Sequence, residues 1–272
     1  MKTVLCLDIG STALKIVALR DGKTISRGAH FPSPANSKML EAYAKEYISS
    51  VGLSCVSHVA VTGVGAFMAG ELLAELPVTR VDEFSAIAAG GLYLSGKDEA
   101  IIVSMGTGTA FLYANRLSGE VRHLGGTGVG GGTLCGLCRH LAGTSDFKEI
   151  ENLASQGRYS AVDLTIADVS PTAIDTLNAE LTAANFAKLT SEPSPADLAA
   201  GAVNMVLQSI GSMAVFLASS CSTREIVLTG SLAAIAQAKA AYEFFNRMYD
   251  IHFTIADDPT FACAIGAGLC AR

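Results

Sequence analysis

The chain has 272 residues, of which 50% are hydrophobic and only 16% are charged. This composition excludes a disordered chain, and the length suits one large domain or two smaller ones. Its 25 acidic and 19 basic side chains leave a net charge of −6. No overall positive field therefore draws the protein to nucleic acid or to an anionic membrane, although a local phosphate site is compatible with this charge.

Seven cysteines, an odd number, and the lack of a secretory signal pattern in this sequence indicate a reducing, cytoplasmic setting. The longest apolar stretch, residues 196–221, is interrupted by polar residues such as Asp197 and Asn204. Such groups would be costly in lipid without partners. We therefore predict that this stretch is a buried helix and not a membrane span.

The first half of the chain alternates strand-like and helix-like segments. Alternating hydrophobic residues and an Asp21-Gly22 turn predict a three-stranded meander, after which the hydrophobic spacing becomes helical. The expected elements are strands at 3–8, 13–19 and 24–31, a helix at 36–51, a strand at 57–62, and helices at 66–76 and 82–94. This order is typical of an α/β fold.

An internal repeat connects the two halves. Residues 5–14 are echoed by residues 102–111, and the turn at 20–23 is echoed by 117–120. A period near half the chain predicts two duplicated domains that face each other, and the polar break at 95–99 divides them into 1–95 and 96–272. In the second half we expect helices at 132–142, 146–156 and 196–221, a strand at 225–228, a helix ending at 249, a strand at 251–255 and a helix at 261–271.

The first copy of the repeat predicts a phosphate-binding turn. Gly10 permits close approach of the backbone, the N–H groups of Ser11 and Thr12 can face phosphoryl oxygens, Lys15 supplies a positive charge, and Asp8 can hold a hydrated Mg²⁺. The alternative is an ordinary hairpin with a solvated lysine.

The second copy supports the phosphate interpretation. Residues 105–109, with Thr107 at their centre, reproduce the turn without an aspartate or a lysine. This is the difference expected if one domain holds the metal and the other only encloses phosphate. Two such turns that face each other would enclose a nucleotide in the cleft between the domains.

A glycine-rich run leads directly into a predicted helix. Six glycines fall between residues 125 and 132, so free backbone N–H groups and the positive end of a helix dipole would meet there, as at an anion site. The alternative is a flexible linker. The spacing matches neither a Walker motif nor a convincing dinucleotide fingerprint.

Three further positions stay ambiguous on pattern alone. The turn at 229–231 suits either contact with a nucleoside or a helix cap at Ser231. Glu83 lies in the first turn of a predicted helix, where a carboxylate serves as a dipole partner or as a general base. Cys135 and Cys138 lack a second pair at metal-ligand spacing, which favours buried cysteines.

Taken together, these motifs resemble those of the superfamily that contains acetate and sugar kinases, heat-shock cognate chaperones and actin, and they are most similar to type II pantothenate kinases. The resemblance is carried by residues 8–15, 81–86, 105–109, 125–136, 146–147, 181–186 and 264–267. It implies two RNase-H-like domains of the actin-like ATPase fold with the nucleotide cleft between them. It also implies phosphorylation by ATP and Mg²⁺ of the primary hydroxyl of pantothenate, the first step of coenzyme A biosynthesis.

The resemblance also assigns roles to residues. It makes Glu83 the catalytic base and gives Asp8 and Lys15 to metal and phosphate. The remaining ATP-binding residues that it implies, together with those of the first turn, are Gly10, Ser11, Thr12, Thr107, Gly131, Gly132, Thr133, Leu134, Cys135, Phe147 and Ser231. A homodimer is implied as well.

One departure from the family concerns the acceptor. The family has an arginine that contacts the pantothenate carboxylate at the position of His123, and the nearest arginine, Arg122, is one residue early. Neighbouring side chains in a strand point to opposite faces, so the carboxylate contact is expected to be weaker, or the acceptor to be a related compound such as pantetheine. A second hypothesis is an ATP-driven activator of a radical 2-hydroxyacyl-CoA dehydratase, and a third is a catalytically silent nucleotide-binding regulator.

Overall fold

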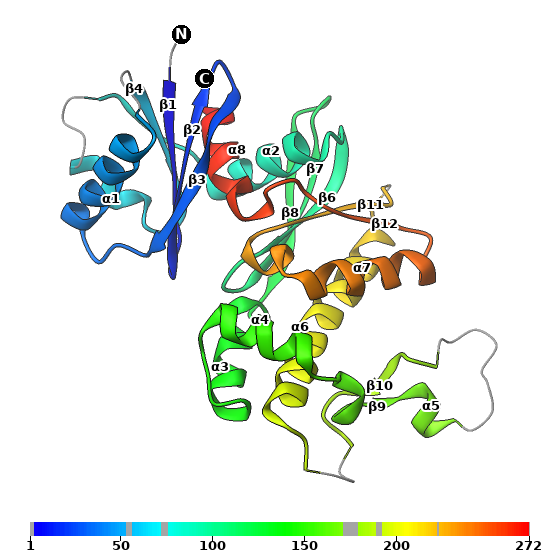
Figure 1. Cartoon of the computed structure of the whole chain (residues 1–272). Helices are drawn as coiled ribbons and strands as arrows, with labels where there is room; N and C mark the ends of the chain where they lie inside the picture. Colours follow the sequence, from blue (N-terminus) through cyan, green and yellow to red (C-terminus); the bar gives the residue numbers. More distant parts are fainter. Residues whose placement is uncertain are drawn as a thin grey trace.

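The computed structural model describes residues 3–52, 56–71, 76–170, 179–188, 192–221 and 223–271. It contains two lobes, each built on a five-stranded sheet (Figure 1). The first sheet and its neighbours comprise β1 (Thr3–Ile9), β2 (Ala13–Arg20), β3 (Lys23–Pro32), α1 (Ser37–Ser50), β4 (Val56–Thr62), η1 (Ala66–Glu71), β5 (Val78–Arg80) and α2 (Glu83–Ser95).

The second lobe begins with β6 (Glu99–Met105), β7 (Thr109–Asn115), β8 (Glu120–Thr127), α3 (Gly131–Leu141) and α4 (Phe147–Gln156). A small extension follows with η2 (Tyr159–Ala161), β9 (Leu164–Thr165), α5 (Ile166–Val169) and β10 (Thr182–Ala184). The chain then forms α6 (Pro195–Ala218), β11 (Glu225–Thr229), η3 (Ser231–Ala234), α7 (Ala236–Met248), β12 (His252–Ile255), η4 (Pro259–Phe261) and α8 (Ala262–Cys270).

The two sheets have the same topology. The strand order is β3-β2-β1-β4-β5 in the first and β8-β7-β6-β11-β12 in the second. In each sheet the first three strands of the repeat form an antiparallel meander, and the last two pair in parallel with the central strand or with each other. This equivalence confirms the duplication and the α/β class predicted from the sequence.

The central strand β1 is buried on both faces. Leu5, Leu7 and Ile9 pack with Leu40 of α1, while Cys6 on the opposite face packs with α8. A strand that is covered on both faces has hydrophobic residues at nearly every position of its sequence. This accounts for the sequence of β1.

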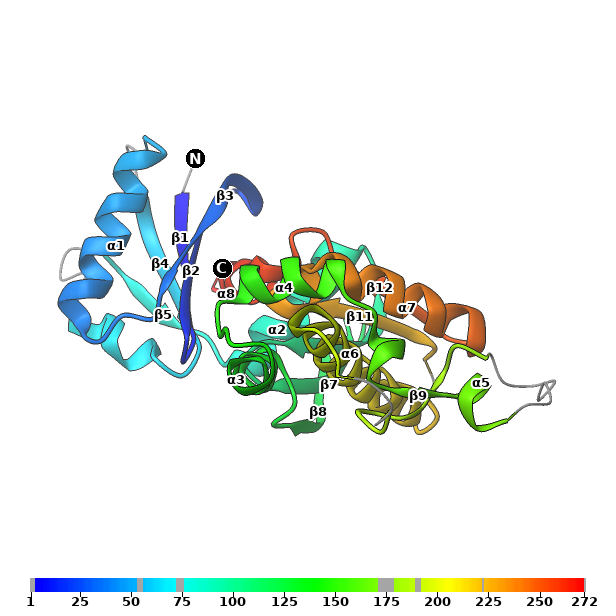
Figure 2. The ribbon, with the colours of Figure 1, turned by 60° about the horizontal axis from the view of Figure 1, so that its bottom comes forward.

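Two helices pack on the sheet of the opposite half of the chain. The residues Ile87 and Leu92 of α2 pack on Ile102 and Val227 of the second sheet, whereas Ile265 of the final helix α8 packs on the first sheet. Figures 1 and 2 show the two helices side by side between the sheets. The division of the chain at residue 95 lies in the turn between α2 and β6 and stays a prediction.

Glycines set the distance between α2 and α8. A Cβ atom on Gly90 would lie 1.9 Å from the Ala262 carbonyl oxygen, and one on Gly266 would lie 1.8 Å from that of Ala86. Each helix therefore presents an alanine and a glycine four residues apart to the other. The backbones of α2 and α8 are therefore in direct contact at this crossing, because there is no room for a side chain between them.

The apolar helix α6 begins with a capping box, in which Ser194 and Asp197 exchange hydrogen bonds. By length and composition it could cross a membrane, yet Val206 and Ile210 are buried in the core of the second lobe with Ile101 of β6. The prediction of a helix packed in the core is confirmed. Phe216, on its other side, is 72% exposed.

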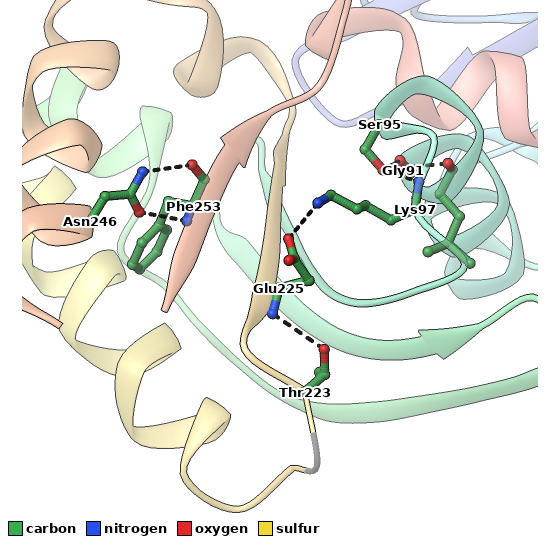
Figure 3. A network of polar contacts seen from close by, with 8 residues as sticks. Gly91, Ser95, Lys97, Thr223, Glu225, Asn246 and Phe253 are labelled. Carbon is green, nitrogen blue, oxygen red and sulfur yellow. Dashed lines mark hydrogen bonds and ion pairs between the residues drawn. The ribbon is translucent and has the colours of Figure 1, made fainter. Parts of the chain in front are cut away.

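An ion pair fastens β11 to the end of α2. Lys97, which follows α2, lies 2.7 Å from a carboxylate oxygen of Glu225, and Thr223 accepts a hydrogen bond from the Glu225 N–H group (Figure 3). On α7, the Asn246 side chain exchanges two hydrogen bonds with the backbone of Phe253 in β12. The first contact ties the end of α2 to β11, and the contact of Asn246 ties α7 to β12.

Some predicted elements differ from the structure. The helix predicted at 66–76 is a short 3-10 turn over Ala66–Glu71, residues 72–75 lie outside the described residues, and Gly70 lowers helix propensity there. The glycine-rich run is only partly a turn, because β8 continues through Gly125 and Gly126 to Thr127.

The crossing of α2 and α8 yields a stability prediction. Gly266→Ala should lower the free energy of unfolding by about 2 kcal/mol or more, because the new methyl group must displace backbone atoms. Gly136→Ala is the matched control: this helical glycine has no atom within 4 Å of the added Cβ, so stability should be unchanged or higher by up to about 1 kcal/mol. Urea unfolding of both variants measures the difference, and equal midpoints would contradict the packing argument.

Candidate active site

A cavity of about 710 Å³ lies between the lobes and is lined by residues of both. Its volume is within the range of small-molecule sites. It brings together most of the predicted site residues: Asp8, Gly10, Ser11, Thr12, Lys15, Glu83, Thr107, Gly131, Gly132, Cys135, Phe147 and Ser231. Residues far apart in the sequence therefore share one cavity.

The turn between β1 and β2 carries an ion pair. Asp8 and Lys15 are direct cross-strand neighbours, and the Lys15 ammonium lies 3.2 Å from Asp8 Oδ2. Both side chains are largely buried, with exposed fractions of 8% and 16%. Gly63, with a φ of +86°, lies so close that a Cβ there would be 2.9 Å from Asp8 Oδ1, so only glycine fits beside this carboxylate.

The turn between β6 and β7 meets the first turn across the cavity. The Thr107 hydroxyl lies 3.1 Å from that of Thr12 and 3.3 Å from that of Ser11. In the second sheet, Ser104 and Ala110 are the cross-strand pair in the place of Asp8 and Lys15, and both line the cavity. The two turns are thus alike in backbone and different in charge.

The glycine-rich segment packs directly on the second turn. Gly131 N–H donates to the Gly106 carbonyl at 2.8 Å, and Gly132 N–H donates to that of Thr107 at 2.9 Å. A Cβ on Gly130 would lie 2.7 Å from Thr107 O. The expectation that the Gly131 and Gly132 N–H groups are free for an anion is wrong, because both are used to hold the second turn in place.

Two other residues predicted on α3 do not reach the cavity. Leu134 is 1% exposed in the core of the second lobe, and the Thr133 hydroxyl donates to Gly128 O at 2.6 Å. Cys135 lines the cavity, while Cys138 is fully buried and burial raises its pKa to about 11. The prediction of buried cysteines is confirmed for Cys138 and is wrong for Cys135, which is only partly buried.

Phe147, Ser231, Pro259 and Thr260 also line the cavity. Gly230 N–H donates to Pro259 O at 2.7 Å, and the φ of +92° at Gly230 brings its backbone against Met105. Pro259 and Thr260 are not among the site residues predicted from the sequence. The signal that could have found them is the Asp-Asp-Pro-Thr turn before the last helix, at the carboxyl edge of the sheet.

Glu83 is the first residue of α2 and lines the cavity. The side chain of Asp82, the N-cap, accepts hydrogen bonds from the N–H and the hydroxyl of Ser85, so the end of the helix is capped without Glu83. Burial, followed by the nearby Asp8 carboxylate, raises the pKa of the Glu83 carboxyl, and the Lys15 charge partly offsets this rise.

Cys263 of α8 also lines the cavity beside these groups. Burial, followed by the charges of Asp8 and Glu83, holds the pKa of its thiol well above the ordinary value. No local pattern predicts a role for Cys263, because only the return of α8 to the first lobe brings it to the cavity.

The two residues predicted to bind the acceptor lie outside the cavity lining. His123 stacks on Phe84, which lines the cavity, with ring centroids 4.5 Å apart and planes inclined by 11°. Arg122 points away: its guanidinium lies 3.6 Å from Glu120 and 5.2 Å above the Tyr113 ring. The expected opposition of these neighbours in a strand is observed, and Arg122 is corrected to a residue outside the site.

The segment at 181–186 is tied to the rest of the small extension of the second lobe by hydrogen bonds. The Asp163 carboxylate, fully buried, accepts hydrogen bonds from Thr182, Asn185, Phe186 N–H and Asn204. None of these residues lines the cavity. The resemblance at this segment reflects a buried polar network, in which all four donors are satisfied by one carboxylate.

Comparisons with known proteins agree with this geometry. The family model named Fumble matches residues 99–252. The chain is 29% identical over 234 residues to the type II pantothenate kinase of Staphylococcus haemolyticus, covering 83% of both chains. It is 30% identical over 202 residues to that of Oceanobacillus iheyensis, covering 71% of this chain and 74% of the relative.

Among solved structures, the activator of the 2-hydroxyisocaproyl-CoA dehydratase from Clostridium difficile, with bound ADPNP, superposes with a TM-score of 0.65. The alignment covers 99% of this chain and 94% of that one at 18% identity, a likeness of fold. By the match of its sequence over most of its length, the chain belongs to the type II pantothenate kinase family, which the Fumble model describes.

Proposed function

We propose that the protein transfers the γ-phosphoryl group of ATP to the primary hydroxyl of pantothenate, the first step of coenzyme A biosynthesis. The observation that carries this proposal is the cavity between the lobes, which is lined both by Glu83 and by the Asp8–Lys15 pair. A carboxylate base beside a phosphate-binding turn is the combination that a kinase for an alcohol requires. The named relatives are type II pantothenate kinases.

The nucleotide would lie along the second lobe. The hydroxyls of Ser11, Thr12 and Thr107 meet where the two turns face each other and can donate to phosphoryl oxygens. Gly131 and Gly132 contribute backbone surface to the cavity. Their N–H groups already donate to the second turn and are not free for the nucleotide. Phe147 and Ser231, which also line the cavity, would flank the nucleoside.

Asp8 is the residue that would hold Mg²⁺ through water. Its carboxylate lies on the cavity wall with Oδ2 directed to Lys15, and oxygen ligands of this kind suit a hard cation. When bound, Mg²⁺ neutralises charge on the phosphate chain. Lys15 supplies a fixed positive charge on the same side.

Glu83 would act as the general base. As the acceptor oxygen forms its bond to the γ-phosphorus, its proton passes to the Glu83 carboxylate, while the bond from phosphorus to the bridging oxygen breaks and ADP leaves. The raised pKa of Glu83 makes it a better proton acceptor than an ordinary glutamate while it is ionised.

Cysteine placement favours the kinase over the dehydratase activator. A cluster shared between subunits needs two well-separated cysteines at one surface. Among the described cysteines, Cys6 and Cys138 are buried, Cys135 and Cys263 line the nucleotide cavity, and Cys270 alone is exposed. The presence of Glu83 in the cavity also argues against a silent regulator.

We further propose that the protein works in the cytoplasm as a homodimer, without nucleic acid or membrane partners. The net charge of −6 supports the last part, and the relatives' activity requires only small molecules.

A coupled assay of ADP release tests the proposed function. Pure protein with ATP and Mg²⁺ is given pantothenate, pantetheine, glycerol or glucose in turn. The proposal expects ADP release that depends on a pantoyl acceptor and a colourless protein. Release independent of acceptor, together with a brown, iron-containing protein, would favour the activator.

The base assignment predicts the behaviour of Glu83→Gln. Phosphoryl transfer should fall by ~10²-fold or more, while ATP binding measured by calorimetry stays nearly unchanged. Glu149→Gln is the matched control, because Glu149 is also acidic in a first helical turn, that of α4, but lies outside the cavity lining. If both variants lose activity equally, or if Glu83→Gln turns over like wild type, Glu83 is not the base.

The raised pKa of Glu83 predicts how the activity of the protein decreases at acidic pH. A base must be ionised, so kcat/KM for the acceptor should fall as pH drops through the pKa of Glu83 in the protein without substrate. Because burial and Asp8 raise this pKa above the ordinary value of 4.5, the fall should begin at a higher pH than for an exposed glutamate. A kcat/KM profile that stays flat down to the ordinary value would contradict this.

The contact between Asp8 and Lys15 predicts how substitutions of these two residues behave, singly and together. Asp8→Asn should raise the Mg²⁺ requirement and Lys15→Met should raise the KM for ATP, because each removes one charge next to the phosphates. In the double variant the losses should be less than additive, since the two groups contact each other at 3.2 Å. Unchanged Mg²⁺ and ATP titrations in both single variants would rule out the phosphate turn.

A further inference from the structure

A second cavity lies within the second lobe, between α6 and α7. Its walls are formed mainly by residues 200–208 of α6 and 237–247 of α7, and we call it the α6–α7 groove. Its volume is about 350 Å³, which is at the lower end of the range for small-molecule sites. No described residue lines both this groove and the nucleotide cavity, so the groove is a separate feature of the molecule.

Small side chains on α7 leave room for the groove. The two helices touch where Gly211 of α6 meets Phe245 of α7, since a Cβ on this glycine would lie 2.6 Å from the Phe245 ring. Away from this contact α7 presents Ala240 and Ala241 to the groove, and methyl groups are too short to span the distance between two packed helices. The groove is therefore set by the packing of the helices themselves.

The wall that α6 contributes is mainly apolar. Val203 and Leu207 line the groove and are otherwise buried in the core of the lobe. Asn204, a polar residue between them, donates its amide hydrogens to Asp163 and Thr182, so these hydrogens are already used within the protein. A ligand with an apolar body would gain free energy by moving from water to this wall.

One guanidinium lies at the end of α7. Arg247 lines the groove, and its Cζ atom lies 5.7 Å from the centre of the Phe244 ring, which lines it too. Among the described residues, no carboxylate lies within ion-pair distance of Arg247. The other charged residue of the described lining, Glu180, has a partner of its own. Arg247 is thus available for an anion, and its planar fork of donors matches a carboxylate.

The charges of the lining also limit the ligand. Glu180 and Arg247 together have no net charge, so the groove does not attract anions in general. An anion gains only by direct contact with Arg247. One carboxylate on an otherwise apolar molecule satisfies both the guanidinium and the apolar wall.

Two elements connect the groove to the nucleotide cavity. α4 begins at Phe147 in the nucleotide cavity, and Ala154 on the same helix lines the groove. α7 follows η3, which begins at Ser231 in the nucleotide cavity. Gln237 joins the two helices, because its Nε2 donates to the Glu151 carbonyl at 2.9 Å. A ligand in the groove should therefore change the affinity for ATP by a limited factor and not compete with it.

We propose that the α6–α7 groove is a second ligand site, separate from the nucleotide cavity, which binds a small monocarboxylate with an apolar body. The apolar body lies between Leu207 and Ala240, and the carboxylate contacts Arg247. The site does not depend on the proposed function, because it shares no described residue with the nucleotide cavity.

Methyl NMR of the whole chain tests both the ligand class and its place. The probe is 4-phenylbutyrate, and 4-phenylbutanamide is its uncharged analogue of the same length. The methyl signals of Leu207 and Ala240 should shift, whereas those of Ala13 and Val64, which line the nucleotide cavity, should not. The Kd of the carboxylate should be about 1 mM or lower. It should also be about fivefold or more below that of the amide, because a charge-assisted contact is gained.

Two arginine variants isolate the charge. Arg247→Met removes the guanidinium from an exposed position and should raise the Kd of 4-phenylbutyrate by about fivefold or more, to that of the amide. Arg139→Met is the matched control, because Arg139 is also exposed in the last turn of a helix but lies outside the groove lining. It should leave both Kd values unchanged. Ala241→Leu, which fills part of the groove, should weaken both compounds.

Four results would overturn the inference. The first is the lack of a shift of the Leu207 and Ala240 signals at about ten times the expected Kd. The second is an equal Kd for the carboxylate and the amide, or an unchanged Kd in Arg247→Met. The third is an apparent Kd that rises in proportion to the ATP concentration, which places the probe in the nucleotide cavity. The fourth is a shift of the same signals on dilution without probe, which shows that a second copy of the chain covers the groove.

The test is independent of the kinase assay. If the probe binds as expected and no acceptor is phosphorylated, the proposed function fails and the second site stands. If an acceptor is phosphorylated and the probe does not bind in the groove, the second site fails and the proposed function stands.

Discussion

The contact on which the site depends is the crossing of α2 and α8 at Gly90 and Gly266. Each helix packs on the sheet of the other half of the chain, so the crossing fixes how the lobes face each other. Glu83 begins α2, and Cys263 lies near the start of α8. Because the backbones touch without intervening side chains, Glu83 is held at a fixed place relative to Asp8, whose strand packs under α8.

The cavity lies between two copies of the same hairpin motif, and the two copies differ in the charged residues that they carry. The hairpins β1–β2 and β6–β7 place equivalent turns opposite each other, close enough for their hydroxyls to meet. In the first lobe a cross-strand Asp8–Lys15 pair stands behind the turn, whereas in the second lobe the equivalent pair is Ser104–Ala110. Charge is concentrated on one side, and the other side is shaped by glycines packed against glycines.

Much of the fold was predictable because its signals are local. The repeat of a hydrophobic strand, a glycine turn and a second strand predicted both hairpins, and the long apolar stretch at 196–221 predicted α6. The location of Glu83 at a helix start followed from pattern, but its side chain fits two roles there. Only the packing of α2 on the opposite sheet places it at the cavity.

What the sequence could not supply depends on contacts between distant segments. Cys263 and Pro259 reach the cavity because the chain returns to it at the end. The glycines at 131 and 132 are typical of an anion site, yet their N–H groups bond to the second turn, a pairing that no local pattern reveals.

The central claim is that this cavity passes a phosphoryl group from ATP to a carbon-bound hydroxyl and not to water. Phosphorus NMR of the wild-type protein with ATP, Mg²⁺ and pantothenate observes this directly. The account predicts a phosphomonoester resonance, split into a triplet by one methylene group, that grows in step with ADP. Growth of inorganic phosphate alone, with no phosphomonoester, would contradict it.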